Sequence, residues 1–298
     1  MIMYFFQKIR LTAMLLILLL VASCSSSNTE KKEDNIQDAL SSKPKKENIA
    51  EQDDYVLPSV AQIAIIFKKA GLKYYDGIAN DTKNITKYEA GNTFSQAINL
   101  GVYSADLSYT ILNAQTEQTK QYFKCCKQMA DKLGFVQAFE TNGITKRIEK
   151  NINHQDSVIN ILSGIQSDID NVLQSEDKEY ISVIAFSGAW IESMYIASHV
   201  YKKSATDKKI TSQIIEQILI AENLIKALKA SEKKDASIIS LIKDIQQIDN
   251  LCNSLQTIKN IKSSDFDVVD PSSLNISKEE IELLTKNIEE IRTRFINY

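Results

Sequence analysis

TFSQAINLGVYSADLSYTILNA, residues 93–114, is the stretch that decides the fold of this 298-residue chain. Apolar and small side chains recur along it at helical spacing and form two stripes, which are Phe94, Ala97, Ile98, Gly101 and Ala105 on one side and Leu100, Tyr103, Leu107 and Ile111 on the other. A helix on a protein surface needs one apolar stripe, whereas two stripes indicate a helix that is covered on most sides. We therefore expect a buried central helix with other helices packed around it.

The rest of the sequence favours an all-α fold. With 8 Gly and 3 Pro, the chain has too few turn residues for a β sandwich. A short helix is expected from Pro58 to Gly71, and the spacing of Ser277 and Glu280 predicts a capping box at the start of a last amphipathic helix. Between them, periodic runs lie at 116–133, 136–150, 155–174, 179–202, 208–230 and 235–258. We expect eight or nine helices in one multi-helix bundle over residues 58–298, with a helical-hairpin array as the alternative arrangement.

The first residues carry the processing signature of a bacterial lipoprotein. Two basic residues, Lys8 and Arg10, precede a short apolar run that ends in Val21-Ala22-Ser23-Cys24. Such a run is too short to span a bilayer comfortably, and it ends in the small residues that a signal peptidase accepts. We expect residues 1–23 to be a signal peptide, Cys24 to carry acyl chains, and the polar residues 24–57 to form a disordered tether.

The net charge of the chain and its predicted lipid anchor limit the kinds of partner that we expect the protein to bind. A net charge of −3 provides no basic surface for a phosphate backbone, so nucleic-acid binding is not expected. The lipid anchor implies a membrane, and the triplet Lys32-Glu33-Asp34 resembles the signal that displays lipoproteins of the Bacteroidota on the cell surface. The predicted location is the cell envelope, at the periplasmic or outer face of the outer membrane.

Two isolated acids indicate a candidate site. Asp106 is the only formally charged residue between Glu89 and Glu117, and Glu192 is the only one between Glu179 and Lys202. A buried carboxylate costs several kcal/mol unless it is paired, hydrogen-bonded or protonated. Arg147 is one of three arginines that follow Cys24, so we predict that its guanidinium binds these carboxylates.

Other polar side chains are expected near the two acids. Helical spacing or chain position places the following residues around them: Tyr103, Tyr109, Asn153, Asp156, Trp190, Tyr195 and His199. One interpretation of the two acids and these residues is a satisfied buried network that fixes helix register. The other is a polar pocket between helices that holds a small ligand.

The sequence does not favour an enzyme. It contains no phosphate-binding Gly-rich loop, nucleophile elbow or zinc-ligand spacing, so no catalytic residue, metal or cofactor is expected. A hydrolase that uses the two carboxylates is the distant alternative. Cys125 and Cys126 are either buried apolar side chains or candidates for a bond with Cys252. A binding or scaffolding role, with a small ligand or an envelope protein as the partner, is the expected function.

The two central runs contain related strings. Gly101, Tyr103, Asp106 and Tyr109 in GVYSADLSY are echoed by Gly188, Trp190, Glu192 and Tyr195, with a slip of one residue after the aromatic side chain. The strings GVYSADLSY (101–109) and GAWIE (188–192) resemble those of uncharacterised helical lipoproteins of the Bacteroidota. This resemblance implies an all-α fold and an envelope location for the chain after Pro58, and it implies no activity.

Overall fold

The computed structural model describes residues 57, 62–63, 70–140, 143–204, 209–210, 214, 217–218, 220–231, 235–263 and 276–297. Among them 83% are helical and none lies in a strand, which confirms the all-α prediction. The predicted signal peptide, Cys24 and the tether as far as residue 56 lie outside the described residues, as does most of the helix expected from Pro58. Leu57 is partly buried against the hydrophobic core, and Gly71 has the left-handed φ of 69° expected of a glycine that ends a helix.

The described part of the chain contains a 3₁₀ turn, η1, and eleven α-helices. In chain order they are η1 (Thr82–Asn84), α3 (Ile85–Glu89), α4 (Thr93–Leu112), α5 (Thr116–Lys132), α6 (Val136–Glu140), α7 (Ile144–Asn151), α8 (Gln155–Ser175), α9 (Glu179–Ser204), α11 (Ile220–Ala230), α12 (Ala236–Ser254), α13 (Gln256–Ser263) and α14 (Lys278–Phe295).

The count exceeds the eight or nine helices expected because two periodic runs are interrupted and because α3 lies between Gly71 and Thr93, where no helix was expected. Gly143 has φ 63°, a left-handed conformation, and separates α7 from α6. Leu255 has an extended backbone and divides the run over 235–258 into α12 and α13. The capping box predicted from Ser277 and Glu280 is present at the start of α14. Apolar periodicity predicted the buried faces but did not reveal these short breaks.

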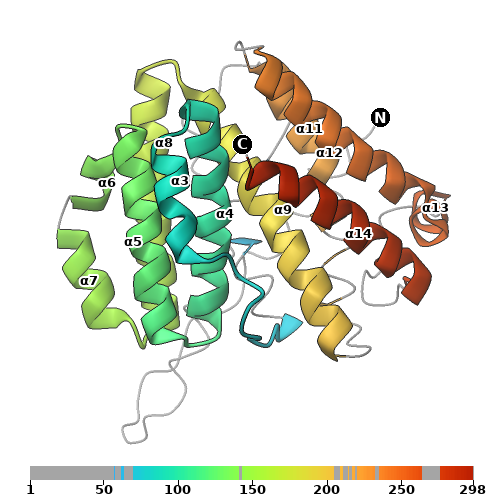
Figure 1. The fold of residues 1–298 in the computed structure, drawn as a ribbon, viewed down its shortest axis with the longest axis horizontal. Coiled ribbons are helices and arrows are strands. Elements are labelled where there is room, and N and C mark those ends of the chain that lie inside the picture. Colours follow the sequence, from blue (N-terminus) through green and yellow to red (C-terminus); the bar gives the residue numbers. More distant parts are fainter. Residues whose placement is uncertain are drawn as a thin grey trace, which may run out of the picture. The chain divides into compact units, whose positions relative to one another are not determined.

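The helices α4 and α9 form the centre of the fold (Figure 1). At their crossing the backbones touch, because a Cβ atom added to Gly101 would overlap the carbonyl oxygen of Ala185. A Cβ atom added to Gly188 would likewise overlap the carbonyl oxygen of Ile98. The two related strings of the sequence therefore meet at this crossing, where only glycine leaves room for the opposite helix.

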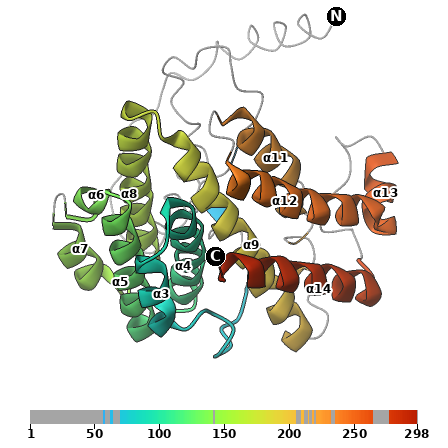
Figure 2. The same ribbon diagram turned by 45° about the horizontal axis from the view of Figure 1, so that its top comes forward.

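The remaining helices lie in two groups beside this pair (Figure 2). One group contains α5 and α8, which pack on α4, together with the short helices α3, α6 and α7. The other contains α11 and α14, which pack on α9, together with α12, which packs on α11 and α14, and α13, which packs on α12. By length and composition α9 could cross a membrane, but 78% of its most apolar window is buried by its neighbours. Its apolar composition is accounted for by its position in the core.

Candidate functional site

The two isolated acids are fully buried, as the sequence predicted. Glu192, on α9, is bound by Arg292 of α14. Arg292 donates from Nε to Glu192 Oε2 at 2.6 Å and from Nη2 to Oε1 at 3.0 Å. The guanidinium also stacks on Tyr195, with Cζ 3.8 Å from the ring centroid. This two-point contact satisfies the buried carboxylate and fixes α14 against α9.

Asn80 connects this ion pair to Asp106. Its Oδ1 accepts a hydrogen bond of 2.7 Å from Arg292 Nη2, and its Nδ2 donates one of 2.8 Å to Asp106 Oδ2. The backbone N–H of Asn80 also donates to Asp106 Oδ2, at 3.3 Å, and its carbonyl accepts from the hydroxyl of Tyr122 at 2.6 Å. The side chain of Asn80 thus links α4 to α14, and its backbone carbonyl adds α5.

The environment of Asp106 favours its neutral form. Burial raises the pKa of Asp106 well above its ordinary value, and the charge of Glu192 raises it further, while the hydrogen bond from Asn80 opposes the shift. Both donors from Asn80 approach Oδ2, whereas Oδ1 has no hydrogen-bond partner among the described residues. This pattern suits a carboxylic acid that accepts through one oxygen and carries its proton on the other.

Two of the predicted tyrosines, both on α4, bind the segment between Gly71 and η1 to that helix. Tyr103 donates its hydroxyl proton to the carbonyl of Asp81 at 3.1 Å. Tyr109 donates to the carbonyl of Lys73 at 2.9 Å and accepts from the backbone N–H of Tyr75 at 2.8 Å. Burial raises the pKa of Tyr109 to about 12, so its hydroxyl remains a donor at neutral pH.

The predicted residues of α9 divide between two sides of that helix. Tyr195 lies under Arg292, and its ring is 4.0 Å from that of His199. His199 Nε2 lies 3.0 Å from Glu289 Oε1 of α14, and burial lowers the pKa of His199. Trp190 donates from Nε1 to the carbonyl of Gln217 at 2.9 Å and is fully buried. It is therefore a core side chain directed away from the acids.

Three of the predicted site residues lie elsewhere. Arg147 is exposed on α7, so the prediction that it pairs with the acids is wrong, and Arg292 takes that place. Asn153 is exposed and accepts a hydrogen bond of 3.2 Å from the Thr116 hydroxyl. Asp156 is exposed in the first turn of α8. Helical periodicity places a residue on a face of its own helix, but it cannot say which helices will meet.

The expected ligand pocket around the acids is not present in the described residues. The side chains of Asp106 and Glu192 have no exposed surface, and their hydrogen bonds go to neighbouring helices and to Asn80. A substrate could not reach them without opening the core. Apart from Asp106 Oδ1, the carboxylate oxygens of the two acids are hydrogen-bonded within the protein, which favours the interpretation as a buried network that fixes helix register.

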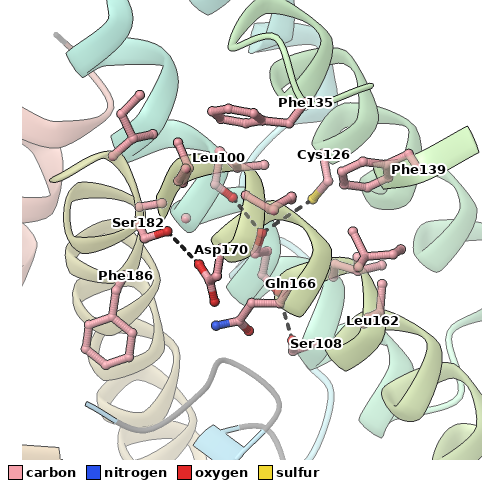
Figure 3. Close-up of a pocket in the computed structure, with 18 of the residues that line it drawn as sticks. Leu100, Ser108, Cys126, Phe135, Phe139, Leu162, Gln166, Asp170, Ser182 and Phe186 are labelled. Atoms are coloured by element: carbon pink, nitrogen blue, oxygen red, sulfur yellow. Dashed lines mark hydrogen bonds between the residues drawn. The ribbon is translucent and has the colours of Figure 1, made fainter. Parts of the chain in front are cut away.

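A pocket lies on the opposite side of α4 (Figure 3). It has a volume of about 130 Å³ and is enclosed by α4, α5, α6, α8 and α9. The second stripe of α4 forms one wall, through Leu100, Leu107 and Ile111. The side chains of Phe135 and Phe139 close one end, and α8 and α9 provide the opposite walls.

The interior of this pocket is effectively apolar. Ser104 and Ser108 contribute hydroxyls, but each donates to a carbonyl of α4 itself, at 2.7 Å and 2.9 Å. Cys126 also lines the pocket, and burial raises the pKa of its thiol, so it contributes apolar surface and not a nucleophile. Cys125, Cys126 and Cys252 are all free and buried.

The sequence interpretation missed Arg292, Asn80 and the pocket. Arg292 could have been found from its position, because it follows Ile288 by four residues and precedes Phe295 by three on the apolar stripe of the last helix. Asn80 carries no such signal, since it lies in an irregular segment. The pocket depends on how five helices leave space between them, which no single periodic pattern specifies.

Comparison with protein-family models, curated proteins and solved structures finds no match. The residues that the structure describes contain no group of three or more His, Cys, Asp or Glu side chains that could hold a metal ion. The function is therefore inferred from the pocket and from the predicted anchor.

Proposed function

We propose that the protein is a lipid-anchored binding protein of the bacterial outer membrane and that it holds a small, mostly apolar ligand in the pocket beside α4. The pocket is the single observation that carries the binding role. The location follows from the signature at Val21-Ala22-Ser23-Cys24, and the resemblance to lipoproteins of the Bacteroidota supports it.

Two observations favour a small ligand over the alternatives. A scaffold needs an exposed apolar surface. The exposed large apolar residues of the described chain are Val172, Ile239 and Leu283, which lie on three different helices. Catalysis by the two carboxylates would require a substrate to reach Asp106 and Glu192, and both are completely buried.

The test is native mass spectrometry of the protein purified from its own envelope. Ser108 is half-buried and lines the pocket, so Ser108→Phe should fill it. Ser163→Phe is the matched control, because Ser163 is also half-buried and also donates to a carbonyl of its own helix, yet it does not line the pocket. We expect a retained small molecule on the wild-type and Ser163→Phe proteins and none on Ser108→Phe.

The proposal fails if the wild-type protein retains no small molecule and its melting temperature does not rise with small apolar compounds such as toluene. It also fails if Ser108→Phe retains the same ligand as the wild type, because the ligand would then lie elsewhere.

A further inference from the structure

The carboxylate of Asp170 lines the pocket and is exposed, so it marks the mouth of the pocket, and it has no cationic partner among the described residues. Asp170 and Gln166 follow one another on the same face of α8 and both line the pocket. Asp170 Oδ1 accepts a hydrogen bond of 2.6 Å from the Ser182 hydroxyl of α9 (Figure 3). This bond orients the carboxylate but leaves its charge uncompensated.

Two of the helices that line the pocket carry no positive charge, and none of the four lysines of α5 lines it. Neither α4 nor α8 contains a lysine or an arginine. Among the described residues that line the pocket, Asp170 is the only charged one. Just beyond α8, Lys178 lies 2.8 Å from Glu176 and is paired there. The potential at the mouth therefore favours a cation and disfavours an anion.

Gln166 adds a second polar group to the mouth. Its amide makes no hydrogen bond that involves the described residues, so both its carbonyl and its NH₂ can contact a ligand. Burial raises the pKa of Asp170 while the hydrogen bond from Ser182 lowers it, and a cation bound beside the carboxylate would favour its ionised form. The mouth thus offers acceptors for the N–H donors of an ammonium group.

The interior limits the size of the rest of the ligand. At about 130 Å³ the pocket is close to the cavity of roughly 150 Å³ that binds benzene in an engineered protein. The serine hydroxyls of α4 are occupied by their own helix, so the walls offer contact and no hydrogen-bond donors. Such a space suits an apolar arm of about six to eight carbon atoms.

Building on the proposed binding role, we propose that the ligand is a primary ammonium with a short apolar arm. The ammonium lies between the Asp170 carboxylate and the Gln166 carbonyl, and the arm extends past Ser108 toward Cys126 and Phe135. Alkylammonium and arylalkylammonium ions share this chemistry.

The experiment compares three probes of eight carbon atoms with different head groups, which are octylammonium, octanol and octanoate. Binding is measured by titration calorimetry on the chain with Cys24→Ala, so that neither acyl chains nor detergent compete for the pocket. We expect octylammonium to bind about tenfold more tightly than octanol, because a charge-assisted hydrogen bond is roughly twice as strong as a neutral one. Octanoate should bind most weakly.

Asp170→Asn should abolish the preference for octylammonium and leave the affinity for octanol within about twofold of its original value. Asp168→Asn is the matched control, since Asp168 is an exposed acid of the same helix that does not line the pocket. It should retain the preference. The preference should also decrease as salt is added, because the carboxylate lies at the mouth and is screened there.

The outcomes separate the two proposals. If octylammonium and octanol bind equally, or if Asp170→Asn keeps the preference, the ligand class is wrong while the binding role stands. If none of the three probes binds to the wild-type pocket, the binding role itself is wrong.

Discussion

Arg292 and Glu192 are 100 positions apart in the chain and form two hydrogen bonds, of 2.6 Å and 3.0 Å, inside the fold. Burial lowers the pKa of Arg292, but the charge of Glu192 and its hydrogen bonds, together with the neighbouring Tyr195 and Asp106, raise it by more in sum, so the guanidinium stays charged. Since Arg292 also donates to Asn80, the pair holds α14, α9 and the segment before η1 together.

Removing one member of this pair should be far more costly than removing both. Arg292→Met or Glu192→Gln leaves a buried polar group without its partner, and we expect each to lower the free energy of unfolding by about 3 to 5 kcal/mol. The double variant should lose much less than the sum. Urea denaturation provides the measurement, with the exposed Arg147→Met as a control that changes stability by less than about 0.5 kcal/mol. Strictly additive losses would show that the two residues are not coupled.

The glycines at the α4–α9 crossing should not tolerate a methyl group. Gly101→Ala and Gly188→Ala each place a Cβ atom on a backbone carbonyl of the other helix, which cannot move aside as a side chain can. We expect a loss of at least about 1 to 3 kcal/mol for each. Gly164→Ala is the control, because Gly164 lies inside α8 with open space around it, and it should stabilise the protein by up to about 1 kcal/mol. Similar melting temperatures for all three variants would contradict the close approach.

Asp106 should make the protein less stable as pH rises. Its pKa is raised in the folded state, so above about pH 4 the folded state holds a proton that the unfolded state has released. The free energy of unfolding then falls with increasing pH until the pKa of the folded state is reached. Asp106→Asn cannot ionise and should remove this contribution.

The comparison is made by urea denaturation between pH 4 and pH 8. Asp106→Asn should gain stability relative to the wild type as pH rises, while Asp168→Asn, which changes an exposed acid, should follow the wild type throughout. Parallel curves for the wild type and Asp106→Asn would mean that Asp106 is ionised in the folded protein.

The predicted anchor depends on one thiol. Cys24→Ala removes the group that accepts the acyl chain, so cells supplied with labelled palmitate should no longer label the protein. Cys125→Ala, which changes a buried cysteine, should be labelled as the wild type is. Label that persists in Cys24→Ala would contradict the lipoprotein interpretation.

The sequence by itself determined the all-α class, the central position of residues 93–114 and the burial of Asp106 and Glu192. These properties are local, because a helix that is apolar on most sides must be covered, and an acid within it is buried with it. The capping box at Ser277 and the helix-ending role of Gly71 are local in the same sense and were also predicted.

Only the tertiary structure decided which arginine meets Glu192, which segment closes over Asp106, and on which side of α4 a pocket remains. Arg147 and Arg292 are chemically equivalent, and the choice between them depends on how α7 and α14 pack, over distances in the chain that periodicity does not encode. The pocket arises where five helices leave space, and Asp170 lines it only because α8 packs with that face toward the space.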